Sequence, residues 1–137
     1  MDVVDETFIA ASPTVVAAAF ADPRSWRGLW PDLDLDLYAD RGDEGLRWTV
    51  RGALVGTMEI WIEPMLDGSL LHYFLRADPP NGSWPRRAPL DRLVARSPVR
   101  AAQREKVRRQ FAAKQVAFRL KAALEDGRPL GCPPARP

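Results

Sequence analysis

The stretch LRWTVRGALVGTMEIWIEPMLDGSLLHYFLR, residues 46–76, decides the fold of this chain. Within it, apolar and polar residues alternate over three runs, 46–51, 58–63 and 71–76. Alternation with a period of two is typical of β-strands that bury one face and expose the other. Turn residues separate the runs, first Gly56 and then Asp67-Gly68, so the sequence predicts successive antiparallel hairpins.

The two turns also predict how the strands pair. A three-residue loop at 54–56 would place Arg51 opposite Glu59, and a two-residue second loop would place Arg76 opposite the same Glu59. Cross-strand pairs of opposite charge contribute about 0.2–1 kcal/mol each. A shift of the pairing by one residue would bury the charges and expose the apolar residues, so the side to which each residue points is well determined.

The predicted pairing sorts these strands into two faces. The inner, apolar face consists of Trp48, Val50, Ile60, Ile62, Leu71, Tyr73 and Leu75. The outer face consists of Arg47, Arg51, Glu59, Glu63, His72 and Arg76, with a row of Thr49, Trp61 and Phe74 across it. The single histidine of the chain is thus expected outside, opposite Glu63, and Tyr73 inside.

Composition and length predict one domain over residues 1–126, followed by a flexible Pro/Gly-rich tail at 127–137. No apolar run approaches the roughly 18–20 residues that cross a bilayer. The acidic start lacks the basic and apolar regions of a signal peptide, so we expect a cytoplasmic protein. Cys132, the single cysteine, lies in the tail and is expected to be an exposed thiol.

Charge is distributed unevenly along the chain. Residues 1–70 hold 13 acids and 5 bases, a net charge of −8, whereas residues 71–137 hold 5 acids and 15 bases, a net charge of +10. The favoured interpretation is that the two halves attract each other within one fold. The alternative is a basic surface for an anionic partner.

Signals for helices and further strands flank this block. Residues 3–10 and 33–37 alternate as strands, and Ser12-Pro13 and Asp22-Pro23 are capping signals that open two short helices, the second ending near residue 29. The carboxylates that alternate with leucine over 32–37 lack the glycine and terminal glutamate of a calcium loop, so no metal site is predicted.

A long helix is predicted from Ser97-Pro98 to about residue 126, after an irregular segment at 77–97 that contains one short helix. The long helix is apolar on two sides, which predicts that it is packed between two layers. One side consists of Val107, Phe111, Phe118 and Ala122, and the other of Val116, Leu120 and Leu124. A sheet with one apolar face, covered by one long helix, predicts an α+β domain.

The helix begins with a basic segment that includes Arg100, Arg104, Arg108 and Arg109. We expect an exposed charged face, with peripheral contact to an anionic membrane as the alternative. The sequence contains no nucleic-acid motif, so no nucleic acid is expected as a partner.

Several of these segments resemble a known superfamily. Residues 10–16 and 21–31 resemble the strand-to-double-helix opening of the SRPBCC proteins, also called START-like or helix-grip proteins. Residues 56–73 resemble their last hairpin. The chain is most similar to the actinobacterial polyketide cyclase/dehydrase and lipid-transport-like subgroup. The resemblance implies a curved antiparallel sheet wrapped on a long C-terminal helix.

One departure from the family concerns the number of strands. Its members usually have seven, whereas about five are predicted here, as if one hairpin were missing before residue 46. The cavity that the family places between sheet and helix should therefore be smaller or more open. The shortened sheet would also leave an edge to be covered by residues 77–97 or by a second subunit.

The resemblance implies a cavity with mostly apolar walls, which suits an apolar small molecule or lipid. Its expected lining is Trp48, Val50, Ile60, Ile62, Tyr73 and Leu75 from the sheet, Phe111 and Phe118 from the helix, and Trp30 at one mouth. The alternative is that the same residues pack together as a solid core.

Catalysis has less support in the sequence. A general acid or base must reach into the pocket, but His72 is expected on the outer face. Tyr73 is the polar inner residue, whereas cyclases of the family use several polar groups. We therefore predict non-catalytic ligand binding, without catalytic residues, metal or cofactor. The alternatives are a polyketide cyclase/dehydrase-type enzyme, or an interaction module that uses Trp61 and Phe74 or the basic helix; a homodimer is a further expectation.

Overall fold

The computed structural model describes residues 1–84 and 97–125 of the 137-residue chain. Their elements are β1 (Asp2–Ile9), α1 (Pro13–Ala18), α2 (Pro23–Leu29), β2 (Leu33–Asp40), the 3-10 helix η1 (Gly42–Glu44), β3 (Gly45–Gly52), β4 (Val55–Met65), β5 (Gly68–Asp78) and α4 (Pro98–Glu125). The predicted α+β class is confirmed. The expected tail and the expected short helix before residue 97 lie outside the described residues.

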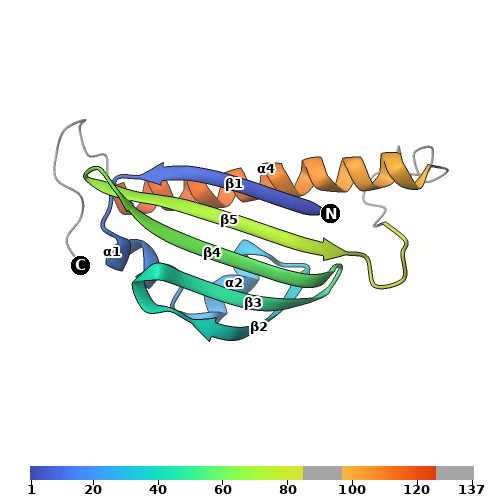
Figure 1. The fold of residues 1–137 in the computed structure, drawn as a ribbon, viewed down its shortest axis with the longest axis horizontal. Coiled ribbons are helices and arrows are strands. Elements are labelled where there is room, and N and C mark those ends of the chain that lie inside the picture. The colour runs from blue at the N-terminus through green and yellow to red at the C-terminus, as the bar shows by residue number, and fades with distance from the viewer. Residues whose placement is uncertain (85–96, 126–137) are drawn as a thin grey trace.

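In the described part of the chain, the strands form one antiparallel five-stranded sheet in the order β1-β5-β4-β3-β2. Strands β2 to β5 follow one another as hairpins, and β1 joins the sheet at β5 (Figure 1). The edge strands are therefore β1 and β2. Figure 1 shows that α4 runs alongside β1, that α2 lies behind the middle of the sheet, and that α1 lies at its left end.

The predicted pairing of β3 with β4 is wrong by four residues. Glu59 lies opposite Arg47 and not opposite Arg51. The turn falls earlier than predicted because Leu54 is fully buried, and an apolar residue at the turn is drawn into the core. The left-handed glycine of this turn is Gly52, with φ of 104°, whereas Gly56 belongs to the strand.

The predicted pairing of β4 with β5 is wrong by two residues. Met65 pairs with Gly68, so the two-residue turn is Leu66-Asp67 and not Asp67-Gly68. Leu66 adopts a φ of 50°, which the sequence did not indicate because leucine rarely occupies this region. Gly68 is needed in the strand, where a Cβ would lie 2.4 Å from the carbonyl oxygen of Ile9.

Both errors are even numbers of residues, so every side chain keeps its predicted side of the sheet. The inner-face residues are confirmed as buried. They are Trp48, Val50, Ile60, Ile62, Leu71, Tyr73 and Leu75, each at most 7% exposed.

The helix α4 is not packed on two sides, which corrects the prediction. Ala113, Val116 and Leu120 are buried, but Phe111 and Phe118 are 66% and 57% exposed. The small side chains allow the helix to approach the edge strand β1 closely, and lysines fasten it there. Lys121 Nζ donates a hydrogen bond to the carbonyl oxygen of Phe8 over 2.6 Å. The aromatic stripe consequently points away from the sheet.

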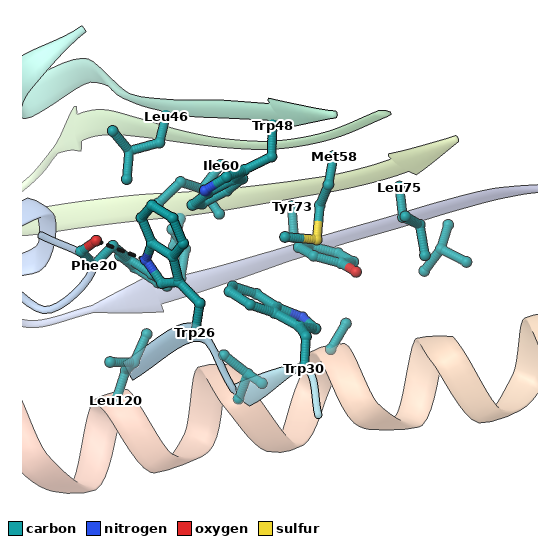
Figure 2. Packing of buried hydrophobic residues seen from close by; sticks show 14 of the residues in the cluster. Phe20, Trp26, Trp30, Leu46, Trp48, Met58, Ile60, Tyr73, Leu75 and Leu120 are labelled. Atoms are coloured by element: carbon teal, nitrogen blue, oxygen red, sulfur yellow. Dashed lines mark hydrogen bonds between the residues drawn. The ribbon is translucent and has the colours of Figure 1, made fainter. Parts of the chain in front are cut away.

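The two short helices begin as predicted. Ser12 Oγ accepts a hydrogen bond from the backbone of Val15, and Asp22 Oδ1 accepts one from Arg24. The Arg24 backbone and side-chain hydrogen bonds lower the pKa of the Asp22 carboxyl. Trp26 of α2 and Trp30, which directly follows this helix, point into the space between the sheet and α4 (Figure 2).

Candidate ligand-binding groove

Tryptophans fill the space in which the resemblance placed a cavity. Trp30 packs against Trp48, with ring centroids 5.7 Å apart, and stacks on Tyr73 at 6.2 Å. Trp26 meets Trp48 edge to face at 5.3 Å. Figure 2 shows these rings between the sheet and α4. The indole nitrogen of Trp26 donates to the carbonyl oxygen of Phe20 over 2.9 Å, which fixes its orientation.

A small void remains between the sheet and α4, near Trp30, Ile60 and Tyr73. Its volume of about 10 Å³ scarcely admits one water molecule. Six of the predicted lining residues, Trp48, Val50, Ile60, Ile62, Tyr73 and Leu75, are therefore core residues in this structure. Of the two expectations, the solid core describes the space around Trp30, Trp48 and Tyr73. Ile60 and Ile62 also line a separate open pocket of about 280 Å³ beside α1.

An open groove of about 1040 Å³ lies on the far side of Trp30, between the α2–β2 connection and α4. The connection gives one wall, and α4 gives the other. The lining residues are Gly28, Leu29, Trp30, Pro31, Asp32, Arg109, Ala112, Gln115, Val116, Phe118, Arg119 and Ala122. The walls are mainly apolar, because most of these side chains are aliphatic or aromatic.

Two residues of the predicted site, Trp30 and Phe118, line this groove. Trp30 is 4% exposed and lines both the groove and the small interior void, so it separates them. Phe111, the other predicted helix residue, is exposed and does not line the groove, so its predicted place inside a cavity is wrong.

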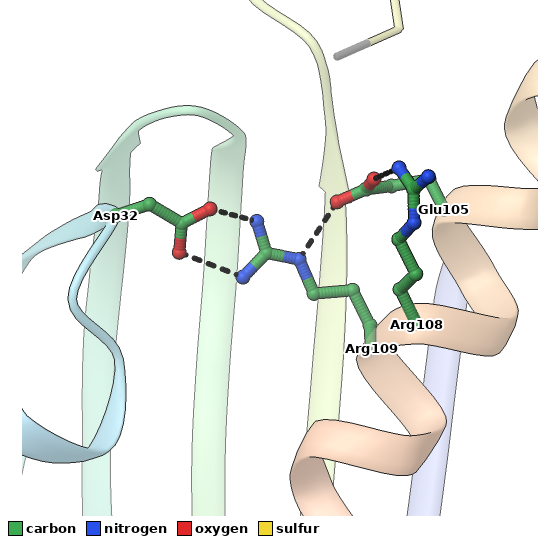
Figure 3. Close-up of polar contacts among 4 residues, drawn as sticks. All are labelled: Asp32, Glu105, Arg108 and Arg109. Carbon is green, nitrogen blue, oxygen red and sulfur yellow. Dashed lines mark hydrogen bonds and ion pairs between the residues drawn. The ribbon is translucent and has the colours of Figure 1, made fainter. Parts of the chain in front are cut away.

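An ion pair between buried Arg109 and half-buried Asp32 connects the two walls of the groove. Arg109 donates two hydrogen bonds to the Asp32 carboxylate, over 2.9 and 2.6 Å, and one to Glu105 Oε1 over 3.0 Å (Figure 3). Arg109 and Glu105 are 6% and 1% exposed. Arg108 Nη1 lies 3.8 Å from the second oxygen of Glu105. Two elements 77 residues apart in sequence are thereby held together.

These contacts keep Arg109 charged. Burial alone would lower the pKa of Arg109, but the hydrogen bonds and charges of Asp32, followed by those of Glu105, outweigh it, and that pKa is raised. Arg109 was expected on an exposed basic face, which is wrong. Of the other arginines expected on that face, Arg100 is exposed, and Arg104 and Arg108 are half-buried.

Tyr73 lies behind the groove, beside the interior void. Burial raises the pKa of the Tyr73 hydroxyl well above its ordinary value of 10, so the hydroxyl stays protonated at neutral pH. The same burial places it out of reach of a molecule in the groove, because Trp30 stacks on its ring.

His72 occupies the outer face of the sheet, as predicted, but it is only 6% exposed. Its Nε2 lies 3.0 Å from Glu63, the expected partner, and its Nδ1 lies 3.2 Å from Glu6. The rings of Trp61 and Phe74 flank it, with centroids 4.3 and 6.2 Å away. Trp61 and Phe74 therefore enclose the histidine and do not pair with each other. Their role as an interaction surface stays a prediction.

Sequence reasoning missed most residues of the groove. Leu29 and Pro31 were interpreted as the end of a helix, and Asp32 as part of an acidic strand. Ala112 and Ala122 are the local signal for the groove, since small residues on one side of a long helix leave room beside it. Nothing local in the sequence indicates that Asp32 meets Arg109.

Within residues 1–84 and 97–125, no group of three or more His, Cys, Asp or Glu side chains is placed to hold a metal ion. Over the same ranges, no helix has the length and apolar character needed to cross a membrane.

No protein-family model matches the chain, and no curated protein matches it either. Solved structures do. The Aha1 dimer from Colwellia psychrerythraea is 11% identical, with 94% of this chain and 99% of that chain covered and a TM-score of 0.59. Mll3558 from Rhizobium loti is 12% identical, with 86% and 95% covered and a TM-score of 0.53.

Ms6760 from Mycobacterium smegmatis is 13% identical, with 89% of this chain and 92% of that chain covered and a TM-score of 0.51. At such low identity, these likenesses show the fold and not the activity. The chain thus has a fold of the helix-grip type.

Proposed function

We propose that the protein binds an apolar small molecule or lipid, without catalysis, in the groove between the α2–β2 connection and α4. The observation that carries this proposal is the open, mainly apolar volume of about 1040 Å³ beside Trp30. Ligand sites in proteins commonly enclose about 300–1000 Å³ and are lined by apolar and aromatic side chains with a few polar groups. The groove matches this description in size and in lining.

The polar groups of the groove support binding more than chemistry. Asp32 and Arg109 hold each other through two hydrogen bonds, so the pair offers a fixed dipole that orients a ligand. A general acid or base must exchange a proton near neutral pH, and a carboxylate held by an arginine is poorly suited to this. Arg119, an exposed residue of the lining, adds a cation that donates hydrogen bonds to a polar head group.

Filling the groove tests the proposal. A double variant, Ala112→Trp with Ala122→Trp, adds two indoles to the lining of the α4 wall. A matched control, Gln110→Trp with Ala123→Trp, adds the same indoles at two exposed positions of α4 that do not line the groove. Binding of fatty acids and of N-phenyl-1-naphthylamine, a neutral apolar dye, is measured by native mass spectrometry and by dye fluorescence.

The expected result is that wild type and control bind these probes, and that the groove variant loses at least tenfold in affinity. Equal binding by all three proteins would place the site elsewhere. No uptake of any probe by the wild type would contradict the proposed function itself.

A further inference from the structure

The outward face of α4 presents large apolar side chains to solvent. Val107, Phe111 and Phe118 are 63%, 66% and 57% exposed. Their spacing of four and seven residues places them along one line of the helix. The side of α4 that packs on the protein is a different one, formed by Ala113, Val116, Ala117 and Leu120. The helix therefore has two apolar sides, one packed on the protein and one exposed to solvent.

The charges around this line are of one sign. Arg100 lies on this line, seven residues before Val107, and is exposed; Arg119, beside Phe118, is exposed near the end of the helix. The two acids of α4 do not offset them, because Glu105 is buried against Arg109, and Glu125, at the last residue, pairs with Lys121 over 2.7 Å. The outward face is therefore cationic and apolar together.

The first turns of α4 add a concave basic surface. A shallow groove of about 520 Å³ is lined there by Arg100, Gln103, Arg104, Val107 and Arg108. Arginine side chains suit phosphate, since the guanidinium fork offers several donors to its oxygens. Figure 1 shows that these turns extend past the N-terminal end of β1, where the sheet does not screen them.

This combination selects among possible partners. A second copy presenting the same face would place arginines and lysines against one another, which opposes association. A nucleic-acid duplex would satisfy the cations but would leave the phenylalanines in water, because its bases are stacked on one another. An anionic lipid bilayer satisfies both, because its phosphates lie directly above hydrocarbon.

We propose that the outward face of α4 docks the protein on anionic membranes. Val107, Phe111 and Phe118 enter the boundary between head groups and acyl chains, and Arg100 and Arg119 contact the lipid phosphates. The helix lies in the plane of the surface, and its 28 residues give a contact about 42 Å long. This surface stands apart from the proposed ligand function, although Phe118 borders both the surface and the groove.

Vesicle flotation with the full chain tests the docking surface. Phosphatidylcholine vesicles are compared with vesicles that also contain phosphatidylglycerol, at low and high salt. The apolar variant is Phe111→Ser with Phe118→Ser, and the charge variant is Arg100→Glu, which reverses one charge on the line. Tyr38→Ser is the matched control, because Tyr38 is 55% exposed on β2, away from α4.

Wild type and Tyr38→Ser should float with phosphatidylglycerol vesicles, and high salt should weaken this. The charge variant and the apolar variant should each lose about tenfold or more in affinity. The Ala112→Trp, Ala122→Trp protein should float normally, which separates this surface from the groove.

Three results would overturn the proposal. One is that wild type does not bind phosphatidylglycerol vesicles at low salt. Another is that the apolar variant binds as well as wild type, because adsorption would then be electrostatic only. The third is a combined result: light scattering shows that wild type is a dimer and that the apolar variant is a monomer, and wild type does not bind vesicles. The outward face of α4 would then be a contact between two copies of the chain.

Discussion

At the scale of single residues, Arg109 joins the two walls of the groove through its hydrogen bonds to Asp32. It is 6% exposed and reaches Asp32 and Glu105, which come from two different elements. A buried ion pair adds little when both charges are compared with well-packed apolar residues, but loss of one partner leaves a buried charge behind. The cost of removing Arg109 alone should therefore be large.

We expect Arg109→Met to lower the free energy of unfolding by about 3 kcal/mol, because Glu105 and Asp32 would lose their counter-charge. Arg119→Met is the control, since Arg119 is exposed on the same helix and should change stability by less than about 0.5 kcal/mol. Urea denaturation followed by circular dichroism measures both. Equal stability of the two variants would mean that the ion pair does not hold α4 to the α2–β2 connection.

The buried Tyr73 hydroxyl should make the free energy of unfolding fall at high pH. Burial raises the pKa of the folded-state hydroxyl above the ordinary value of 10. Its contribution is fully present below about pH 10 and is lost above it, where the unfolded tyrosine ionises and the folded one does not. Relative to Tyr73→Phe, wild type should lose up to about 1.4 kcal/mol of stability per pH unit there.

Urea titrations between about pH 8 and about pH 11 measure this difference, and comparison with the variant cancels the other titrating groups. Tyr38→Phe is the control, because Tyr38 is 55% exposed. A constant difference between wild type and Tyr73→Phe across this range would show that Tyr73 is not buried as described.

At the scale of elements, the orientation of α4 distinguishes this structure from the sequence prediction. Both stripes of the helix are apolar, and periodicity alone cannot choose which one faces the sheet. The choice depends on how close the helix lies to β1, and alanine at 113 and 117 permits a close approach that phenylalanine would prevent. This information is tertiary and is absent from any local window of sequence.

A pair of substitutions on α4 tests its orientation. Leu120 is 8% exposed and Phe118 is 57% exposed. We expect Leu120→Ala to cost about 2–4 kcal/mol, because a cavity forms in the core, and Phe118→Ala to cost less than about 1 kcal/mol. Thermal and urea denaturation measure both. A larger cost for Phe118→Ala would mean that the aromatic stripe faces the protein.

Replacement of two glycines by alanine should change the stability of the protein in opposite directions. At Gly45, with φ of 129°, an added Cβ would lie 2.0 Å from the carbonyl oxygen of Ile60. Gly45→Ala should therefore destabilise β3–β4 pairing by more than about 2 kcal/mol.

Gly28 lies within α2, where no atom approaches such a Cβ within 4 Å. Gly28→Ala should stabilise the protein by about 0.5 kcal/mol, because alanine loses less backbone entropy in a helix. Denaturation midpoints of both variants measure the contrast. The same sign of change for both would contradict the backbone description.

At the scale of the whole molecule, local signals predicted more than long-range ones. Strand alternation and proline-containing caps are written in short windows, so the elements and the sides of the strands were predictable. Turn positions were not, because a buried Leu54 and a left-handed Leu66 contradict ordinary turn chemistry. The groove was not predictable either, since it forms where residues 28–32 meet a helix that begins at residue 98.

The interior shows the same limit. The sequence predicted Trp48 on the inner face of the sheet and Trp30 at one mouth of a cavity, but not that their rings would meet and close that space. Volume filling depends on the distances between layers, which short windows of sequence do not specify. The open volume that we propose for a ligand lies outside the tryptophan layer, in the groove.

Methyl NMR with an apolar ligand tests this central claim most directly. Spectra of the full chain are recorded during titration with a fatty acid that native mass spectrometry shows to bind. The account predicts shifts at Ala112 and Ala122, which line the groove, and little change at Val50, which is 1% exposed inside the core. Shifts concentrated at Val50 and its buried neighbours, with the groove methyls unchanged, would contradict it and place the ligand in the interior.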